Sequence, residues 1–119
     1  MNQGKEQFRK RIYQFVIRLV KFLTLLPRDV VIREIIGQLM RSGTSVGANY
    51  FESEAASSKK DYQNYFSHSL KSANETKFWL GLLRDSKKAP REKSDCLLKE
   101  VQELSNILGA SLVTLRSKK

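Results

Sequence analysis

The sequence predicts an all-α protein, an antiparallel four-helix bundle with up-down-up-down topology. Four long segments repeat apolar residues with helical periodicity, and none alternates in the manner of a β-strand. The breaks between the segments are short, which makes consecutive helices antiparallel neighbours. The 119 residues suffice for one domain with its own core, without disulfides or structural metals. We therefore expect residues 1–119 to form a single bundle domain.

The first helix is expected over residues 5–26. Tyr13, Ile17 and Val20 widen its apolar face to an arc of about 220° at 100° per residue. One helix of a monomeric bundle buries a stripe of only about 100° to 140°. The excess predicts a homo-oligomer with an interface at Tyr13, Ile17 and Val20. The face itself consists of Phe8, Ile12, Phe15, Val16, Leu19, Phe22, Leu23 and Leu26.

The second helix is expected over residues 29–55, with Asp29 as its cap. Its stretch RSGTSVGAN resembles a phosphate-binding loop at first sight. However, the Gly43–Gly47 spacing is too short, and Ala48 stands where such a loop needs lysine. On a helix, both glycines fall beside the apolar stripe. Because a glycine inside a helix costs about 1 kcal/mol relative to alanine, we interpret them as the surface that another helix approaches closely.

The third and fourth helices are expected over residues 58–85 and 91–116. Ser58 is placed to cap the third helix, and Pro90 is placed to start the fourth. Each helix carries one apolar face suited to the bundle core. The inner residues of the two helices are Tyr62, Tyr65, Phe66, Ser69, Leu70, Ala73, Leu80 and Leu83, followed by Leu97, Val101, Leu104, Leu108, Leu112 and Leu115.

Residue types argue against catalysis. The chain has one histidine, His68, and one cysteine, Cys96, which are too few for a zinc site or for a convincing catalytic triad. An acid–base pair that uses Glu52 and Glu75 remains a third and last alternative. We expect these carboxylates to join a structural polar network between helix faces, and we expect no catalytic residue, cofactor or metal. The network consists of Arg41, Asn49, Glu52, Asn74 and Glu75.

The net charge is the remaining feature that bears on function. A formal net charge of +10 on 119 residues favours an anionic partner, most plausibly nucleic acid. No helix-turn-helix spacing, RNA-recognition motif or zinc finger accompanies it, so we expect contacts to RNA or DNA phosphates without sequence specificity. A merely solvated basic surface is the open alternative. In an up-and-down bundle the basic residues gather at both ends, and the candidates are Arg9, Lys10, Arg11, Lys59, Lys60, Arg84, Lys87, Lys88, Arg91 and Lys93.

The sequence also bears on the compartment. No apolar run approaches the roughly 20 residues of a membrane span, and the start of the chain lacks the features of a signal peptide. A lone cysteine suits a reducing environment. We expect a cytoplasmic protein without membrane contact.

Two stretches, RSGTSVGANYFESEAASSKKDY and HSLKSANETKFWLGLL, carry a resemblance to a known family. The chain resembles the four-helix bundle proteins encoded in intervening sequences of bacterial large-subunit ribosomal RNA genes. That family is similar in turn to the accessory variability proteins of diversity-generating retroelements. The matching residues are Arg41, Gly43, Ser45, Val46, Asn49, Glu52, Leu70, Ala73, Asn74, Glu75, Trp79 and Leu83.

The resemblance implies a small bundle that assembles into a ring-like homopentamer. The retroelement relatives bind nucleic acid and a reverse transcriptase, whereas the ribosomal RNA members have no clear activity. The chain departs from the family pattern at Phe51, where an acidic residue is common, and at His68. The net charge and the basic clusters at both ends of the bundle give the first hypothesis, an oligomeric nucleic-acid-binding protein. The wide apolar arc of the first helix gives the second, a protein-interaction scaffold, for example an accessory subunit of a reverse transcriptase or of another partner.

Overall fold

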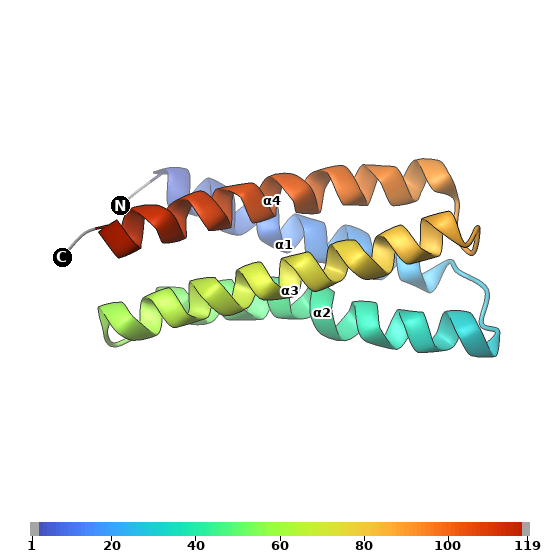
Figure 1. The fold of residues 1–119 in the computed structure, drawn as a ribbon, viewed down its shortest axis with the longest axis horizontal. Helices are drawn as coiled ribbons and strands as arrows, with labels where there is room; N and C mark the ends of the chain where they lie inside the picture. The colour runs from blue at the N-terminus through green and yellow to red at the C-terminus, as the bar shows by residue number, and fades with distance from the viewer. Residues whose placement is uncertain (1–2, 118–119) are drawn as a thin grey trace.

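The computed structural model describes residues 3–117, and within this range every regular element is an α-helix. The helices are α1 (Gln3–Thr24), α2 (Val30–Glu54), α3 (Lys59–Asp85) and α4 (Arg91–Ser117). They run alternately up and down along a rod of 49 × 23 × 21 Å (Figure 1). The predicted all-α, four-helix class is confirmed, and the helix ends lie within two residues of the expected positions.

The helices occupy the corners of a square. α2 packs against α3, α3 against α4, and α1 against both α2 and α4. α1 and α3 are therefore diagonal to each other, so their outer surfaces face different directions (Figure 1). The start of α1, the end of α4 and the α2–α3 turn lie at one end of the rod, which we call the terminal end. The α1–α2 and α3–α4 turns lie at the other, the connection end.

Local interactions fix where the helices begin and end. The Asp29 carboxylate accepts a hydrogen bond from the Ile32 amide at 2.8 Å, which caps α2. Ser58 caps α3 in the same way by accepting from the Asp61 amide at 3.1 Å. These side chains satisfy amides that have no partner within the helix. The two cap residues expected from sequence are confirmed.

The end of α3 has an unusual residue in a familiar motif. Lys87 adopts φ 60°, and its amide donates to the Arg84 carbonyl at 3.1 Å, while the Lys88 amide donates to the Leu83 carbonyl at 2.9 Å. This pair of bonds is the Schellman arrangement, whose left-handed residue is usually glycine. A lysine there has a Cβ that crowds the backbone.

A continuous apolar core runs along the rod. Its centre comes from all four helices, as the faces found in the sequence predict. Leu19 of α1, Val46 of α2, Leu80 of α3 and Leu104 of α4 are each fully buried. The other fully buried core residues are Ile12, Phe15, Leu39, Ala73, Leu83, Val101 and Leu108.

The two glycines of α2 let α1 approach closely. A Cβ built on Gly43 would overlap the Leu19 Cδ2 methyl, and one on Gly47 would lie 3.3 Å from Val16 Cγ2. Both glycines sit inside a continuous helix, so the close-approach interpretation is confirmed and a phosphate loop is excluded.

Small hydroxyl residues join α2 to α3. The Ser69 hydroxyl donates to the Val46 carbonyl at 2.7 Å, and Thr76 donates to the Ser42 hydroxyl at 3.1 Å. All these hydroxyls are buried and hydrogen-bonded, as buried polar groups must be. None of the described helices is both long and apolar enough to cross a bilayer.

Candidate nucleic-acid interface

The structure divides the predicted phosphate-binding cations into two groups, and the first is held in ion pairs. Arg11 of α1 donates to both carboxylate oxygens of Glu100 on α4, at 2.7 and 2.9 Å, and also contacts Glu103. The hydrogen bonds to Glu100 and, to a smaller extent, to Glu103 raise the pKa of Arg11 above its ordinary value. They also lower the pKa of Glu100. Arg11 therefore joins α1 to α4.

Other arginines of the predicted set are likewise paired with acids. Arg84 at the end of α3 donates to Asp95 of α4 at 2.8 Å and to its neighbour Asp85 at 2.9 Å. Arg91 lies 3.9 Å from Asp95. At the terminal end, Arg9 lies 3.6 Å from Glu54. These guanidinium groups have protein partners that a phosphate would have to displace.

The second group consists of lysines, and these are open to solvent. All of the predicted lysines are exposed. At the connection end, Lys87, Lys88 and Lys93 make no ion pair with any residue in 3–117. Lys10 and Lys60, at the terminal end, likewise lack an acidic partner within the described chain. The remaining member of the group is Lys59.

The connection-end lysines border a groove between the end of α1 and the start of α4. Two adjoining hollows of about 460 and 290 Å³ share Phe22, Leu25 and Lys93, and we call their union the α1–α4 groove. Its apolar floor includes Leu25, which is 74% exposed. All of its charged lining residues are cationic, namely Arg18, Lys21, Lys87, Lys88 and Lys93.

Arg18, Lys21 and Leu25 were missed as site residues in the sequence. Arg18 and Lys21 fell in the polar arc of the first helix, and Leu25 fell outside its apolar face. In the structure Arg18 reaches α4, where its guanidinium donates to the Cys96 sulfur at 3.6 Å. The three residues are spaced at i, i+3 and i+7, so they share one helical side. This spacing in the sequence could have indicated that the three residues belong to one surface.

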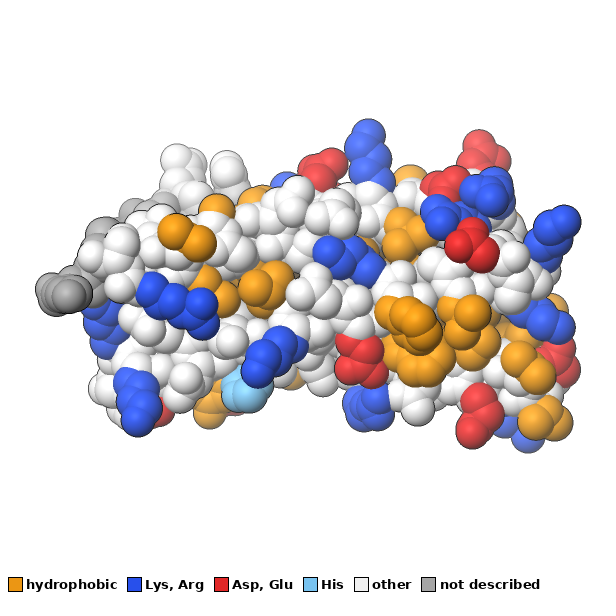
Figure 2. Space-filling view, in the orientation of Figure 1, with side chains coloured by type: hydrophobic (Ala, Val, Ile, Leu, Met, Phe, Trp, Pro, Cys, Tyr) orange, Lys and Arg blue, Asp and Glu red, His pale blue; other side chains and the backbone are white. Residues whose placement is uncertain are grey.

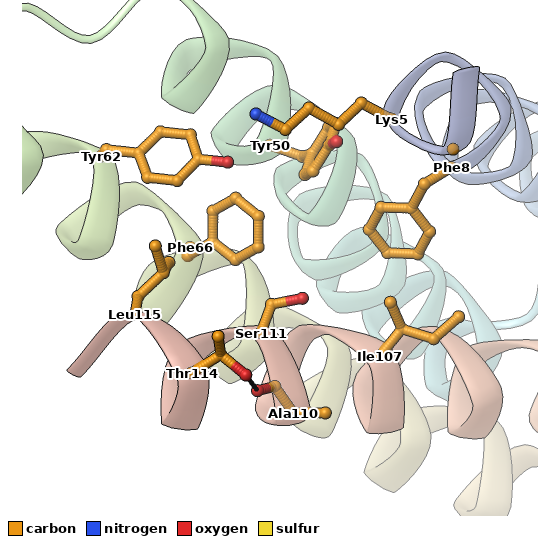
Figure 3. A pocket seen from close by; sticks show the side chains of 11 residues that line it. Lys5, Phe8, Tyr50, Tyr62, Phe66, Ile107, Ala110, Ser111, Thr114 and Leu115 are labelled. Atoms are coloured by element: carbon orange, nitrogen blue, oxygen red, sulfur yellow. Dashed lines mark hydrogen bonds between the residues drawn. The ribbon is translucent and has the colours of Figure 1, made fainter. Parts of the chain in front are cut away.

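A second hollow, of about 640 Å³, opens at the terminal end between all four helices. Figure 3 shows aromatic rings from α1, α2 and α3 around it, with Lys5 at its mouth. Phe8 meets Tyr50 edge-on at 5.1 Å between ring centroids, and the Lys5 ammonium lies 5.9 Å from the Tyr62 ring centroid. The lining is predominantly apolar, with Ile107 and Leu115 from α4.

The titratable groups of this terminal cleft do not form an acid–base pair. Burial raises the pKa of Tyr50 to about 12, with smaller contributions from Glu54 and Tyr62. Burial likewise raises the pKa of Tyr62. Both phenols are therefore neutral near pH 7, and the cleft offers mainly apolar contacts.

Of the five residues predicted to form a polar network, only Arg41 and Glu75 interact with each other. Arg41 of α2 donates to Glu75 of α3 at 2.9 Å, and the Trp79 indole donates to the same carboxylate at 3.2 Å. Trp79 and then Arg41 lower the pKa of Glu75 through these bonds. Asn49 instead donates to the Ser45 carbonyl within its own helix, at 2.9 Å.

The other two members of that network lie apart from the ion pair. Glu52 and Asn74 are exposed, and neither makes a side-chain hydrogen bond to another residue in 3–117. Glu52 borders a shallow groove of about 310 Å³ between α1 and α2, far along the rod from Glu75. The two carboxylates proposed as an acid–base alternative are not brought together.

Two apolar patches remain on the outside of the bundle. The first, the α1–α2 patch, consists of Tyr13, Ile17, Val20 and Phe51. Tyr13 is 55% exposed and its ring lies 6.2 Å from that of Phe51, while Ile17 and Val20 are half-buried. Phe51 was noted in the sequence only as a departure from the family, and the structure adds it to the predicted interface residues.

The second patch lies on α3 and was not predicted. It consists of Phe78, Trp79 and Leu82, with Phe78 61% exposed and packed edge-on against Trp79 at 4.9 Å. Figure 2 shows hydrophobic side chains gathered over α3 toward the connection end. We call it the α3 patch.

Potential metal ligands do not converge within residues 3–117. No group of three or more His, Cys, Asp or Glu residues is placed to hold a metal ion in this range. His68 is exposed on α3, and Cys96 is an exposed free thiol on α4.

Comparisons with known proteins give one family. The model of the family described as 23S rRNA-intervening sequence protein matches residues 5–110. A solved structure from Bacteroides thetaiotaomicron, titled as a protein with unknown function from the S23 ribosomal protein family, superposes with a TM-score of 0.81. It is 31% identical, over 88% of this chain and 97% of that chain. No curated protein matches the sequence.

Proposed function

The chain belongs to the family of 23S rRNA-intervening sequence proteins, and on that premise we propose a non-enzymatic, oligomeric protein that binds RNA or DNA phosphates without reading base sequence. The observation that carries the proposal is the division of cations described above. The arginines of the predicted set are paired with acids, whereas five of its lysines are exposed and have no acidic partner in the described chain, namely Lys10, Lys60, Lys87, Lys88 and Lys93. Such ammonium groups attract phosphates and release their counterions on binding.

The two outer apolar patches support self-assembly. Soluble monomers seldom leave such surfaces open. Because the α1–α2 patch and the α3 patch lie on diagonal helices, one copy can dock the first against the second patch of its neighbour. Contacts between unlike surfaces propagate head to tail and form a ring when the rotation between successive copies closes. Five subunits are favoured through the family resemblance. A ring would repeat each lysine cluster around its axis and raise phosphate affinity through multivalency.

Binding to unrelated oligonucleotides tests the first part of the proposal. Fluorescence anisotropy with RNA and DNA strands of different sequence should give similar affinities that fall steeply as salt rises. No binding at low salt would reject nucleic-acid binding. A strong preference for one sequence would reject phosphate-only contact.

A protein-interaction scaffold is the second candidate, and the exposed Phe78 and Tyr13 rings favour it. Aromatic side chains are enriched at protein interfaces. A reverse transcriptase, which the retroelement accessory proteins bind, is one example of such a partner. A purified reverse transcriptase retained by the protein after nuclease treatment would favour the scaffold, whereas loss of the complex with nuclease would favour nucleic-acid binding.

We place the protein in the cytoplasm. Cys96 is an exposed free thiol, which suits a reducing compartment. The structural roles of Glu75 and the exposure of Glu52 support the absence of catalysis in this proposal.

A further inference from the structure

The α1–α4 groove concentrates positive charge over an apolar floor. Its charged lining residues are all cationic, so the groove favours an anionic ligand over a cationic one. The hydrogen bond from Arg18 to the Cys96 sulfur holds one of these cations against α4. The volumes of about 460 and 290 Å³ suit a small organic group better than a simple ion.

Lys87 is an independent observation at the same place. It adopts φ 60°, a conformation that glycine adopts without strain and lysine does not. Strained residues tend to cluster at functional sites, where the side chain supplies something that the relaxed residue cannot. Glycine would complete the same helix end without strain. What lysine adds here is an ammonium group at the rim of the groove.

The floor indicates which form of nucleic acid fits. Leu25 lines both hollows together with the cations, and it is 74% exposed. A duplex presents phosphates on its outside and keeps its bases stacked within, so it would leave Leu25 unused. A single strand can place an unstacked base on an apolar surface while its phosphates reach the surrounding cations.

We propose that the α1–α4 groove binds single-stranded nucleic acid, with phosphates at Lys87, Lys88 and Lys93 and a base against Leu25. The inference rests on the proposed function, which it narrows to one surface and to one form of nucleic acid.

Variants of the rim provide the first test. An unstructured uridine oligonucleotide is titrated at several salt concentrations against the wild type, Lys87→Gly and Lys93→Gln. Each variant should bind more weakly, and its log–log salt slope should be shallower by about 0.7, the value of one phosphate contact to a single strand. Lys99→Gln removes the same charge from an exposed position on the outside of α4 and should keep the wild-type slope. Lys87→Arg keeps the charge and should keep the affinity.

Lys87→Gly also separates binding from folding. Because glycine relieves the positive φ, this variant should melt at a higher temperature than the wild type while it binds more weakly. A merely structural role of Lys87 would not produce this opposite pair of effects.

Cys96 provides a second test, because it lines the groove and is the only cysteine of the chain. The uridine oligonucleotide should slow alkylation of Cys96 by a neutral maleimide in the wild type, and less so in Lys93→Gln. An RNA duplex at the same phosphate concentration should protect less. Phosphatidylglycerol vesicles should not protect.

Each contrary result has a defined meaning. Two results would reject the groove as the binding site. One is a wild-type salt slope in both Lys87→Gly and Lys93→Gln, and the other is protection of Cys96 by vesicles or by the duplex instead of the single strand. Either result would still allow phosphate binding elsewhere on the protein. If Leu25→Ser lowers the mass of the assembly and leaves oligonucleotide affinity unchanged, the groove is a subunit contact and the inference fails. Absence of any oligonucleotide binding by the wild type would reject the proposed function itself.

Discussion

Arg11 and Glu100 are 89 residues apart in the chain and form a two-pronged ion pair at 2.7 and 2.9 Å between α1 and α4. Glu100 is the less exposed partner, with 18% of its side chain accessible against 35% for Arg11. Two parallel charge-assisted bonds fix the relative position of the helices more firmly than a single contact does. The pair thus fixes α1 against α4.

Breaking the Arg11–Glu100 pair should weaken the fold. In a double-mutant cycle with Arg11→Ala and Glu100→Ala, we expect a coupling energy of about 1 kcal/mol, at the upper end for a partly exposed pair because the contact is bidentate. Urea unfolding of the four proteins measures it. The Arg9–Glu54 pair, at 3.6 Å and more exposed, serves as the control and should couple less. Equal coupling in the two cycles would contradict this role of geometry.

The same ion pair should make stability depend on acid pH. Arg11 lowers the pKa of Glu100 in the folded protein below its unfolded value, which is roughly 4.3. The stabilisation is therefore complete above that pH and is lost as the pH falls through the lower, folded value. The difference in unfolding free energy between the wild type and Glu100→Gln should be largest near pH 7 and shrink toward pH 3. A constant difference over this range would show that the pair does not govern the pKa of Glu100.

Alanine should have opposite effects at two glycines of α2. At Gly43 a Cβ would overlap Leu19, so Gly43→Ala should destabilise the fold by roughly 1 to 3 kcal/mol through overpacking. At Gly37 a Cβ would meet nothing within 4 Å, so Gly37→Ala should stabilise by up to about 1 kcal/mol through helix propensity. Thermal unfolding followed by circular dichroism compares the two. Stabilisation by Gly43→Ala would mean that α1 can move away from α2 at little cost.

Self-assembly should depend on the outer side of α1. Replacing Ile17 and Val20 together with lysine should split the oligomer and leave helical content largely intact, because both side chains are only half-buried in the single chain. Gln7 and Gln14 are exposed on the same helix, and their replacement with lysine adds the same charge as a control. Light scattering gives the masses. A wild-type mass near 13.7 kDa at micromolar concentration would rule out the assembly.

The positions of the four helices, and several of the contacts that fix them, could be predicted from residue types and spacing alone. The caps at Asp29 and Ser58, the buried face of each helix and the close approach at Gly43 follow from local spacing and residue type. These features depend on interactions within one or two turns, or on which side of a helix is apolar. Both kinds of feature can be predicted from the sequence, because successive residues of a helix are rotated by about 100°.

Which basic residues form ion pairs within the protein depends on how the helices pack and could not be predicted from the sequence. Arg11 and Lys87 looked equivalent as basic residues, yet one meets Glu100 and the other lies at the open rim of a groove. Periodicity shows which side of a helix faces inward, but not which helix flanks it or at what height. Ion pairs and grooves between α1 and α4 depend on that placement, because charges interact strongly only over a few ångströms and the residues concerned are far apart in the chain.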